Sequence, residues 1–209
     1  LTSYNSGAYQ TMLGYPSGGG SNEDICSFGA INDDVCYFYV YTGGYVGRLI
    51  TSQVFRDPSA WYHMVFVWDT TNATSGDRMR LYVNGSRVTA FSTASYPSQN
   101  AVSNINTAAQ QNIGRYNTSG TLDAYLSEVN FIDGQALTPS SFGGTDKDGN
   151  WSPIAYTGSY GQNGFYLNFK DATSTSTIGY DYSGNGNNWS ASVRSEEHTS
   201  ELQSHHDLV

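Results

Sequence analysis

The sequence has no apolar run that approaches the roughly 18 residues needed to cross a membrane, so we expect no membrane span. Basic residues are also scarce, since 9 Lys and Arg stand against 18 Asp and Glu, and no basic patch occurs. We therefore expect no nucleic-acid partner. Residues that favour helices, such as Lys, Glu and Leu, are few, whereas Tyr, Ser, Thr, Asn and Gly are abundant. This composition favours strands and turns, and the length suits one β-rich domain or slightly more.

The sequence contains only two cysteines, Cys26 and Cys36. No second pair of Cys or His stands at a zinc-binding spacing, so a zinc site is not expected. If this region forms a hairpin that turns near Ile31, the two cysteines could lie opposite each other on adjacent strands. They would then form either a disulfide, which is often strained in this geometry, or two buried free thiols. The sequence leaves both alternatives open.

Residues 194–209 differ from the rest of the chain. Residues 194–204, R-S-E-E-H-T-S-E-L-Q-S, match the translation of a common short-read sequencing adapter, and residues 207–209 fit its continuation. We expect this tail to be adapter-derived, and the alternative is a charged, solvated helix. The tail holds three of the four histidines, and without it 14 acidic and 8 basic residues remain. Because the chain begins at Leu1 within strand-like sequence, we also expect a fragment of a longer reading frame, truncated at its N-terminus.

Residues 61–69 predict a strand with two mostly apolar faces. One face would carry Trp61, His63, Val65 and Val67, and the other would carry Tyr62, Met64, Phe66 and Trp68. We therefore expect a central strand that is covered on both sides.

Residues 78–86 predict a second strand that ends in a tight turn. Its inward side chains would be Met79, Leu81 and Val83, and its outward ones Arg78, Arg80, Tyr82 and Asn84. Asn84 and Gly85 both accept positive φ, which predicts a two-residue hairpin. We also expect strands over residues 25–31, 35–46 (continuing to 51) and 125–132. Short strands separated by turn signals predict a β-sandwich or barrel.

The two strands at 61–69 and 78–86 resemble the middle of a laminin-G-like, concanavalin A-like jelly roll, whose pattern is W-x-H-V-A-V-x-x-D followed by L-Y-V-N-G. The resemblance extends to residues 112–114, 126–133 and 135–138, and it covers residues 25–142. Ala124 stands where many members have Gly. The resemblance implies an all-β, antiparallel sandwich.

We expect four parts in the chain. Residues 1–142 would form the jelly roll, residues 143–163 a linker, and residues 194–209 the foreign tail. Residues 164–193 resemble the opening of such a module through D-Y-S-G-N-G-N at 181–187, so they either begin a second module or supply closing strands to the first. Residues 131–143, and the F-G-G-T-D-K-D-G-N-W linker at 142–151, also resemble tail or fibre-like proteins of marine bacteriophages.

Catalytic residues are not apparent. Glu23 and Glu128 are the only glutamates outside the tail, and the odd separation of Glu128 from Asp133 places them on opposite faces of a strand. The paired carboxylates of a glycosidase are therefore not expected. His63 lies within an apolar strand, and the sequence contains no G-x-S-x-G motif. We expect a protein without enzymatic activity.

Calcium is the one cofactor for which candidate ligands exist, and otherwise we expect none. Residues 146–150, D-K-D-G-N, have alternating oxygen ligands in Asp146, Asp148 and Asn150. An EF-hand loop would continue with Gly and Glu, where this chain has Trp151 and Thr157, so a simple polar turn is the alternative. By resemblance, Asp77 or Asp123 could contribute to calcium binding at a sandwich rim.

Carbohydrate binding is the function that the resemblance most strongly implies. The candidate contacts are Tyr116, Asn117 and Tyr125, which lie near a predicted loop rim, although Tyr is also an ordinary strand residue. We expect a binding or structural module of a phage tail or fibre-like protein, located in a virion or outside the cell. Its partners would be host-surface glycans or other virion subunits. The alternative is an accessory carbohydrate-binding module of a secreted bacterial protein or glycoside hydrolase.

Overall fold

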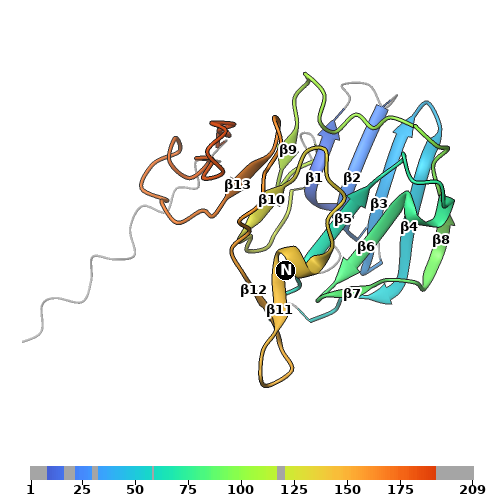
Figure 1. Cartoon of the computed structure of the whole chain (residues 1–209), viewed down its shortest axis with the longest axis horizontal. Coiled ribbons are helices and arrows are strands. Elements are labelled where there is room, and N and C mark those ends of the chain that lie inside the picture. The colour runs from blue at the N-terminus through green and yellow to red at the C-terminus, as the bar shows by residue number, and fades with distance from the viewer. Residues whose placement is uncertain (1–8, 17–21, 30–32, 58, 117–120, 192–209) are drawn as a thin grey trace, which may run out of the picture.

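The computed structural model describes residues 9–16, 22–29, 33–57, 59–116 and 121–191 (Figure 1). Asn117 and the expected adapter tail lie outside these ranges. In the described part the chain forms short strands and two 3₁₀ helices, η1 (Ser75–Asp77) and η2 (Pro139–Ser141). The strands are β1 (Gln10–Pro16), β2 (Asn22–Phe28), β3 (Val35–Thr42), β4 (Tyr45–Val54), β5 (Met64–Trp68), β6 (Met79–Val83), β7 (Ser86–Arg87), β8 (Phe91–Ser95), β9 (Asn112–Ile113), β10 (Val129–Phe131), β11 (Gly143–Thr145), β12 (Trp151–Pro153) and β13 (Phe165–Leu167).

The larger layer is a six-stranded antiparallel sheet in the order β8-β4-β3-β2-β1-β9. The prediction of one continuous strand over residues 35–51 is wrong, because a turn at Gly43 and Gly44 divides this segment into β3 and β4. Gly43 has φ +69°, a conformation that glycine adopts readily. The sheet therefore gains one more antiparallel hairpin than the sequence predicts.

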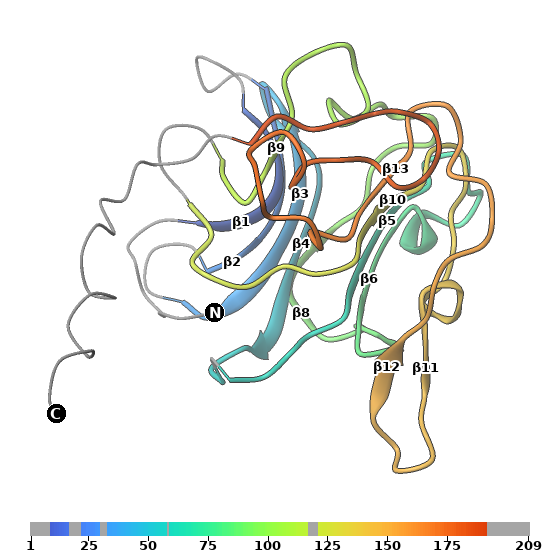
Figure 2. The ribbon, with the colours of Figure 1, turned by 90° about the vertical axis from the view of Figure 1, so that its left-hand side faces the viewer.

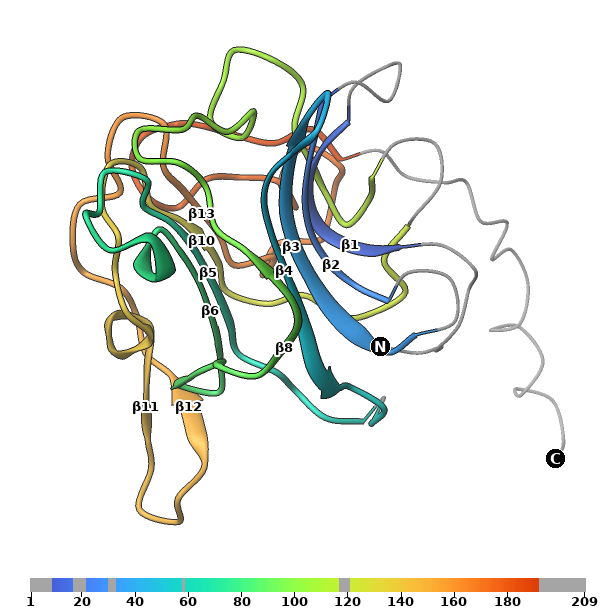
Figure 3. The same ribbon diagram turned by 90° about the vertical axis from the view of Figure 1, so that its right-hand side faces the viewer.

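The second layer contains β5, β6 and β7, with the β10–β13 pair beside β5 (Figures 2 and 3). All assigned strand pairs are antiparallel, which confirms the expected all-β sandwich. The prediction that residues 61–69 form a central strand is wrong, since β5 is the end strand of its three-stranded sheet. Its second face is only partly covered: Val67 is buried and the Trp151 ring lies 5.2 Å from the ring of His63, but Trp61 is 67% exposed.

The core lies between the two layers. Met64, Phe66 and Trp68 of β5 pack there, as their shared face predicts, against buried side chains of β2, β3 and β4. Met79, Leu81 and Val83 of β6 are also buried, which confirms the predicted inward set. Tyr82, expected to face solvent, is only 9% exposed. It stands between Val65 and Arg87 on the neighbouring strands, so its ring is flanked on both sides.

The predicted Asn84–Gly85 hairpin is confirmed. Val83 pairs with Ser86, and the two turn residues have φ values of 46° and 79°. The Asn84 side chain also accepts a 2.8 Å hydrogen bond from the His63 backbone N–H, and the Asn84 N–H donates to the His63 carbonyl. The turn is thereby tied to the residue that precedes β5.

Cys26 and Cys36 are buried free thiols. Cys26 lies opposite Phe38 and Cys36 lies opposite Phe28, so the two cysteines are diagonal neighbours rather than a directly facing pair. Burial raises the pKa of both thiols. Both thiols are therefore neutral at physiological pH.

Near its C-terminal end the chain returns to the sandwich. β13 pairs with β10, and the rings of Phe131 and Phe165 stack at 5.3 Å. The strand expected over residues 125–132 is shorter than predicted, because Glu128 has a left-handed φ of 55° and β10 begins at Val129. Residues 143–163, expected as a linker, include the β11–β12 hairpin, which projects from the sandwich (Figure 1). No helix in the described ranges is long and apolar enough to span a membrane.

The carboxylate of Asp181 organises the last described loop. It accepts hydrogen bonds from the N–H groups of Tyr166, Ser183 and Asn187 and from the Ser183 hydroxyl, at 2.8–2.9 Å. Burial alone would raise the pKa of Asp181, but these hydrogen bonds together hold it below its usual range. The D-Y-S-G-N-G-N motif is thus fixed against β13 by one ionised side chain.

We predict that Gly85→Ala destabilises the fold by about 1–3 kcal/mol more than Gly184→Ala. Both glycines have positive φ, but a Cβ at Gly85 would lie 2.3 Å from the Trp151 ring, whereas nothing lies within 4 Å at Gly184. Urea unfolding of the two variants measures the difference. Equal losses of stability would show that Trp151 does not pack closely on the turn.

We predict that Asp181→Asn lowers the free energy of unfolding at pH 7 by about 1.5–3 kcal/mol. Because the pKa of Asp181 is lower in the folded state, its contribution is present above the unfolded-state value and disappears as pH falls through the folded-state pKa. Unfolding measured from pH 7 to about pH 2 should therefore show a gap that is constant above about pH 5 and that narrows below the unfolded-state pKa of roughly 3.9. Asp148→Asn, at an exposed salt bridge, should change little; a constant gap for Asp181→Asn across this range would contradict the assignment.

Candidate functional site

Tyrosines fill the outer face of the six-stranded sheet. In β3, Cys36, Phe38 and Val40 point toward the second layer, so Tyr37 and Tyr39 point the other way. The six-stranded sheet is curved, and its concave side faces away from the second layer (Figures 2 and 3). We call this surface the tyrosine face; it comprises Tyr9, Ile25, Val35, Tyr37, Tyr39, Tyr41, Tyr45, Arg48, Ile50 and Tyr116.

The rings of the tyrosine face contact one another edge to face. The Tyr9 ring lies 5.6 Å from Tyr37 and 6.4 Å from Tyr39, while Tyr45 lies 5.5 Å from Tyr39 and 5.2 Å from Tyr41. Tyr37 and Tyr39 are buried and form the floor, whereas Tyr45 is 49% exposed. The Arg48 guanidinium carbon sits 4.4 Å from the centre of the Tyr45 ring, a cation–π distance. The face therefore combines a rigid aromatic floor with an accessible aromatic rim.

Two carboxylates hold the phenol groups of this face. Asp33 accepts a 2.6 Å hydrogen bond from the Tyr37 hydroxyl, and Glu23 accepts a 3.0 Å hydrogen bond from Tyr39. Tyr116 is also hydrogen-bonded to Glu23. Burial, and secondarily these carboxylates, raise the pKa of the three tyrosines. Their hydroxyls therefore stay protonated at neutral pH, and the face presents neutral phenols beside carboxylate acceptors.

Three buried polar atoms at this face have no hydrogen-bond partner within the described ranges. They are the hydroxyls of Thr11 and Ser27, which lie opposite each other on β1 and β2, and Nε of Arg48. Buried polar groups are usually hydrogen-bonded, so three exceptions on one face are unusual. All three atoms are closed to solvent.

The structure brings one of the predicted ligand contacts to the tyrosine face. Tyr116 packs against the floor tyrosines, while Tyr125 is 79% exposed on the segment that follows Thr121. Asn117 lies outside the described residues. The tyrosines of β3 and Tyr45 were missed, although their signal is present: Tyr37, Tyr39 and Tyr41 alternate at the spacing of one strand face.

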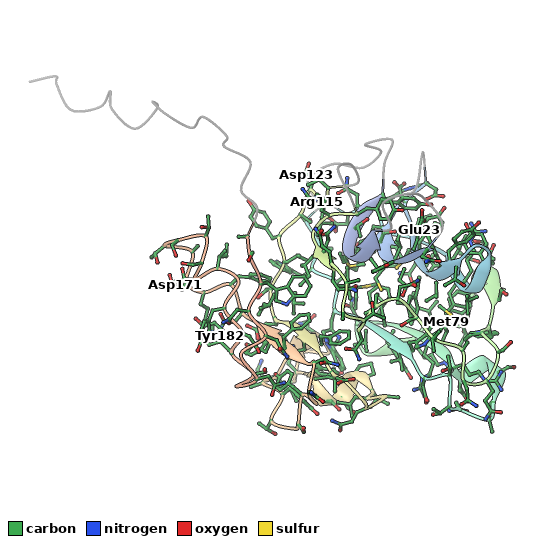
Figure 4. The ribbon with its side chains drawn as sticks, turned by 90° about the horizontal axis from the view of Figure 1, so that it is seen from above. Glu23, Met79, Arg115, Asp123, Asp171 and Tyr182 are labelled. Carbon is green, nitrogen blue, oxygen red and sulfur yellow. The ribbon has the colours of Figure 1, made fainter. Side chains whose placement is uncertain are left out.

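The candidate calcium ligands each have a local hydrogen-bond or ion-pair partner. Asp77 forms a 2.6 Å ion pair with Arg87, and Asp146 accepts hydrogen bonds from the N–H groups of Asp148 and Asn150 within its own turn. Asp123 lies near Arg115, on the same side of the molecule as Glu23 (Figure 4). Within the described ranges, no three His, Cys, Asp or Glu residues gather as a metal site would require.

The residues weighed for catalysis hold structural contacts. Glu128 accepts a hydrogen bond from the Tyr166 hydroxyl, and Asp133 accepts from Asn106 and from the Asn163 N–H. Burial lowers the pKa of His63, whose Nδ1 has no hydrogen-bond partner in the described part of the chain. A general base must contact the group it deprotonates, and no described nucleophile is bonded to this ring.

Comparison with known proteins places most of the chain in one family. A family model described as the concanavalin A-like lectin/glucanases superfamily matches residues 2–142. This match includes β1 to β10, and therefore every strand of the tyrosine face. No curated protein matches the chain, and no solved structure does.

Proposed function

Because the chain belongs to the concanavalin A-like lectin/glucanases superfamily, we propose that it is a non-catalytic module that binds carbohydrate on its tyrosine face. The observation that carries this proposal is the set of protonated tyrosines held by Glu23 and Asp33 around an exposed Tyr45. Aromatic faces contact the C–H groups of sugars, and neutral hydroxyls and carboxylates bond their hydroxyl groups. The tyrosine face offers both kinds of group on one rigid sheet.

The ligand we propose for this face is a neutral glycan. Glu23 and Asp33 place two negative charges beside the phenols, whereas Arg48 is the one basic residue assigned to the face. An anionic sugar would therefore meet net repulsion here. A neutral chain would instead use the carboxylates as hydrogen-bond acceptors.

The setting we propose is a phage tail or fibre-like protein that contacts host-surface glycans, in a virion or outside the cell. Its support is the similarity of residues 131–143 to such proteins. The alternative is an accessory module of a secreted bacterial protein or glycoside hydrolase. Sequencing of the parent locus separates the two settings: adjoining virion genes support the first, and an adjoining hydrolase domain supports the second.

We predict that Tyr45→Ala weakens binding of a neutral glycan at least about tenfold, because it removes the accessible ring. A glycan array identifies the ligand, and calorimetry on the full chain then measures its affinity. Tyr180→Ala is the matched control, since Tyr180 is 50% exposed outside the tyrosine face and should leave affinity unchanged. Tyr45→Phe keeps the ring and should retain binding.

Three outcomes would contradict this proposal. If no glycan on the array binds, the module is not a carbohydrate binder. If the two alanine variants bind equally well, the ligand lies elsewhere on the molecule. If the bound glycan is hydrolysed, and Glu23→Gln or Glu128→Gln abolishes the hydrolysis, the protein is an enzyme.

We also propose that glycan binding needs no calcium, because Asp77 and Asp146 already have local partners. Affinity should then be the same in millimolar calcium and in excess chelator. Binding that requires calcium and is lost in Asp77→Asn, Asp123→Asn or Asp146→Asn would identify a metal site and overturn this part of the proposal. Thermal unfolding with and without calcium gives a second readout that does not depend on the glycan.

A further inference from the structure

Residues 159–191, which we call the closing unit, are held together by contacts within the unit. The Asp181 carboxylate accepts a 2.8 Å hydrogen bond from the Tyr166 N–H of β13. The Phe165 ring of β13 lies 4.9 Å from the ring of Trp189, near the last described residue. Figure 1 shows the residues after β13 as a lobe beside the two layers. These internal contacts would survive if the closing unit moved as a whole.

The closing unit meets the rest of the protein at one segment. β13 pairs only with β10 among the strands assigned in the described ranges, and the Phe165 ring stacks on Phe131 at 5.3 Å. Every hydrogen bond or ring contact that joins the unit to the rest of the described chain ends on residues 128–135 or on Tyr156. A single acceptor segment around β10 therefore holds the unit in place.

An exposed connector, residues 155–158, joins the closing unit to the preceding hairpin. All four residues are exposed except Tyr156, which is half-buried. The backbone groups of the connector form no hydrogen bond within the described ranges. Tyr156 is held through its side chain, whose ring lies 5.2 Å from Phe142 and 5.1 Å from Tyr160. The connector can therefore change direction without breaking a backbone hydrogen bond.

We propose that the closing unit is exchanged between two copies of this chain, so that β13 of each copy pairs with β10 of the other. The partner of β10 already comes from outside the family match, which ends at residue 142. The closed monomer and the exchanged dimer would contain the same contacts between β10 and β13. Their free energies therefore differ only through the connector and the protein concentration, which makes exchange a low-cost route to a dimer.

The proposed exchange is independent of the proposed glycan binding. The tyrosine face belongs to the six-stranded sheet, whereas β10 and β13 lie beside β5 in the second layer. Figure 4 shows Tyr182 of the closing unit well apart from Glu23, which bonds the tyrosines. Failure of one proposal would therefore leave the other standing.

Asn130 and Tyr166 face each other across the two strands, and their geometry suits a disulfide. The Tyr166 N–H bonds the Asp181 carboxylate, and its carbonyl accepts from the Tyr182 N–H, so both groups point away from β10. The two residues are therefore a non-hydrogen-bonded pair, whose Cα atoms typically lie about 4.5 Å apart. That separation lies within the range of about 4.4–6.8 Å that disulfides span.

The test mixes the full-length variants Asn130→Cys and Tyr166→Cys at high concentration under mild oxidation. Exchange brings the two introduced thiols together across chains, so we expect at least about tenfold more disulfide-linked dimer than either variant gives alone. Non-reducing electrophoresis and mass spectrometry measure the product. The matched control mixes Asn130→Cys with Tyr180→Cys, because Tyr180 is 50% exposed on the closing unit and does not face β10. Cys26 and Cys36 are buried and should not react.

A shortened connector gives a second test that needs no new cysteine. Deletion of residues 155–158 hinders the return of the closing unit to its own β10 but leaves β10 and β13 unchanged. We therefore expect the deletion to tighten dimerisation at least about tenfold, as measured by analytical ultracentrifugation. The original chain should dimerise more weakly, with a dimer fraction that rises with concentration.

Three outcomes would overturn the proposal. Linked dimer no more abundant than in the Tyr180→Cys mixture would show that the copies do not exchange the unit. If Tyr166→Cys does not fold, the shortened chain decides, and a monomer at every concentration up to its solubility limit would refute exchange. Asn130→Cys and Tyr166→Cys combined in one chain and oxidised lock the unit onto its own β10. Dimers that persist in this locked chain would use another surface.

Discussion

The alternation of side chains along β3 is the constraint on which the rest of the molecule depends. Cys36, Phe38 and Val40 fill the core between the layers, while Tyr37 and Tyr39 fill the opposite face. A strand that must satisfy both faces cannot shift by one residue without exchanging them. The register that builds the core therefore also builds the tyrosine face, and the two surfaces share one set of backbone hydrogen bonds.

Much of the fold could be predicted because its signals are local. The Asn84–Gly85 turn needs two residues that accept positive φ, and the burial of Met79, Leu81 and Val83 follows from the period of a strand. The predictions fail where contacts between residues far apart in the sequence determine the local structure. β5 ends its sheet, and the contact beside it comes from Trp151, which packs on His63 from more than 80 residues away. β10 begins late because Glu128 adopts a left-handed φ.

The candidate sites were less predictable than the fold for a similar reason. Tyr116 could be identified from its place near a loop rim, but the face it joins combines Tyr9, just before β1, with residues of β2, β3 and β4. The regular spacing of Tyr37, Tyr39 and Tyr41 is visible in the sequence, yet ordinary strands share that composition.

The pairing of β13 with β10 extends the structural unit beyond the segment that defines the family. The family match ends at residue 142, but Phe165 and Leu167 cover Phe131 and Val129 from outside it. A chain cut at the end of the match would leave β10 as an open, apolar strand edge. Such edges template the addition of further strands from other molecules. The boundary that sequence comparison suggests is therefore a poor place to divide this protein, since it would turn a closed sandwich into one prone to self-association.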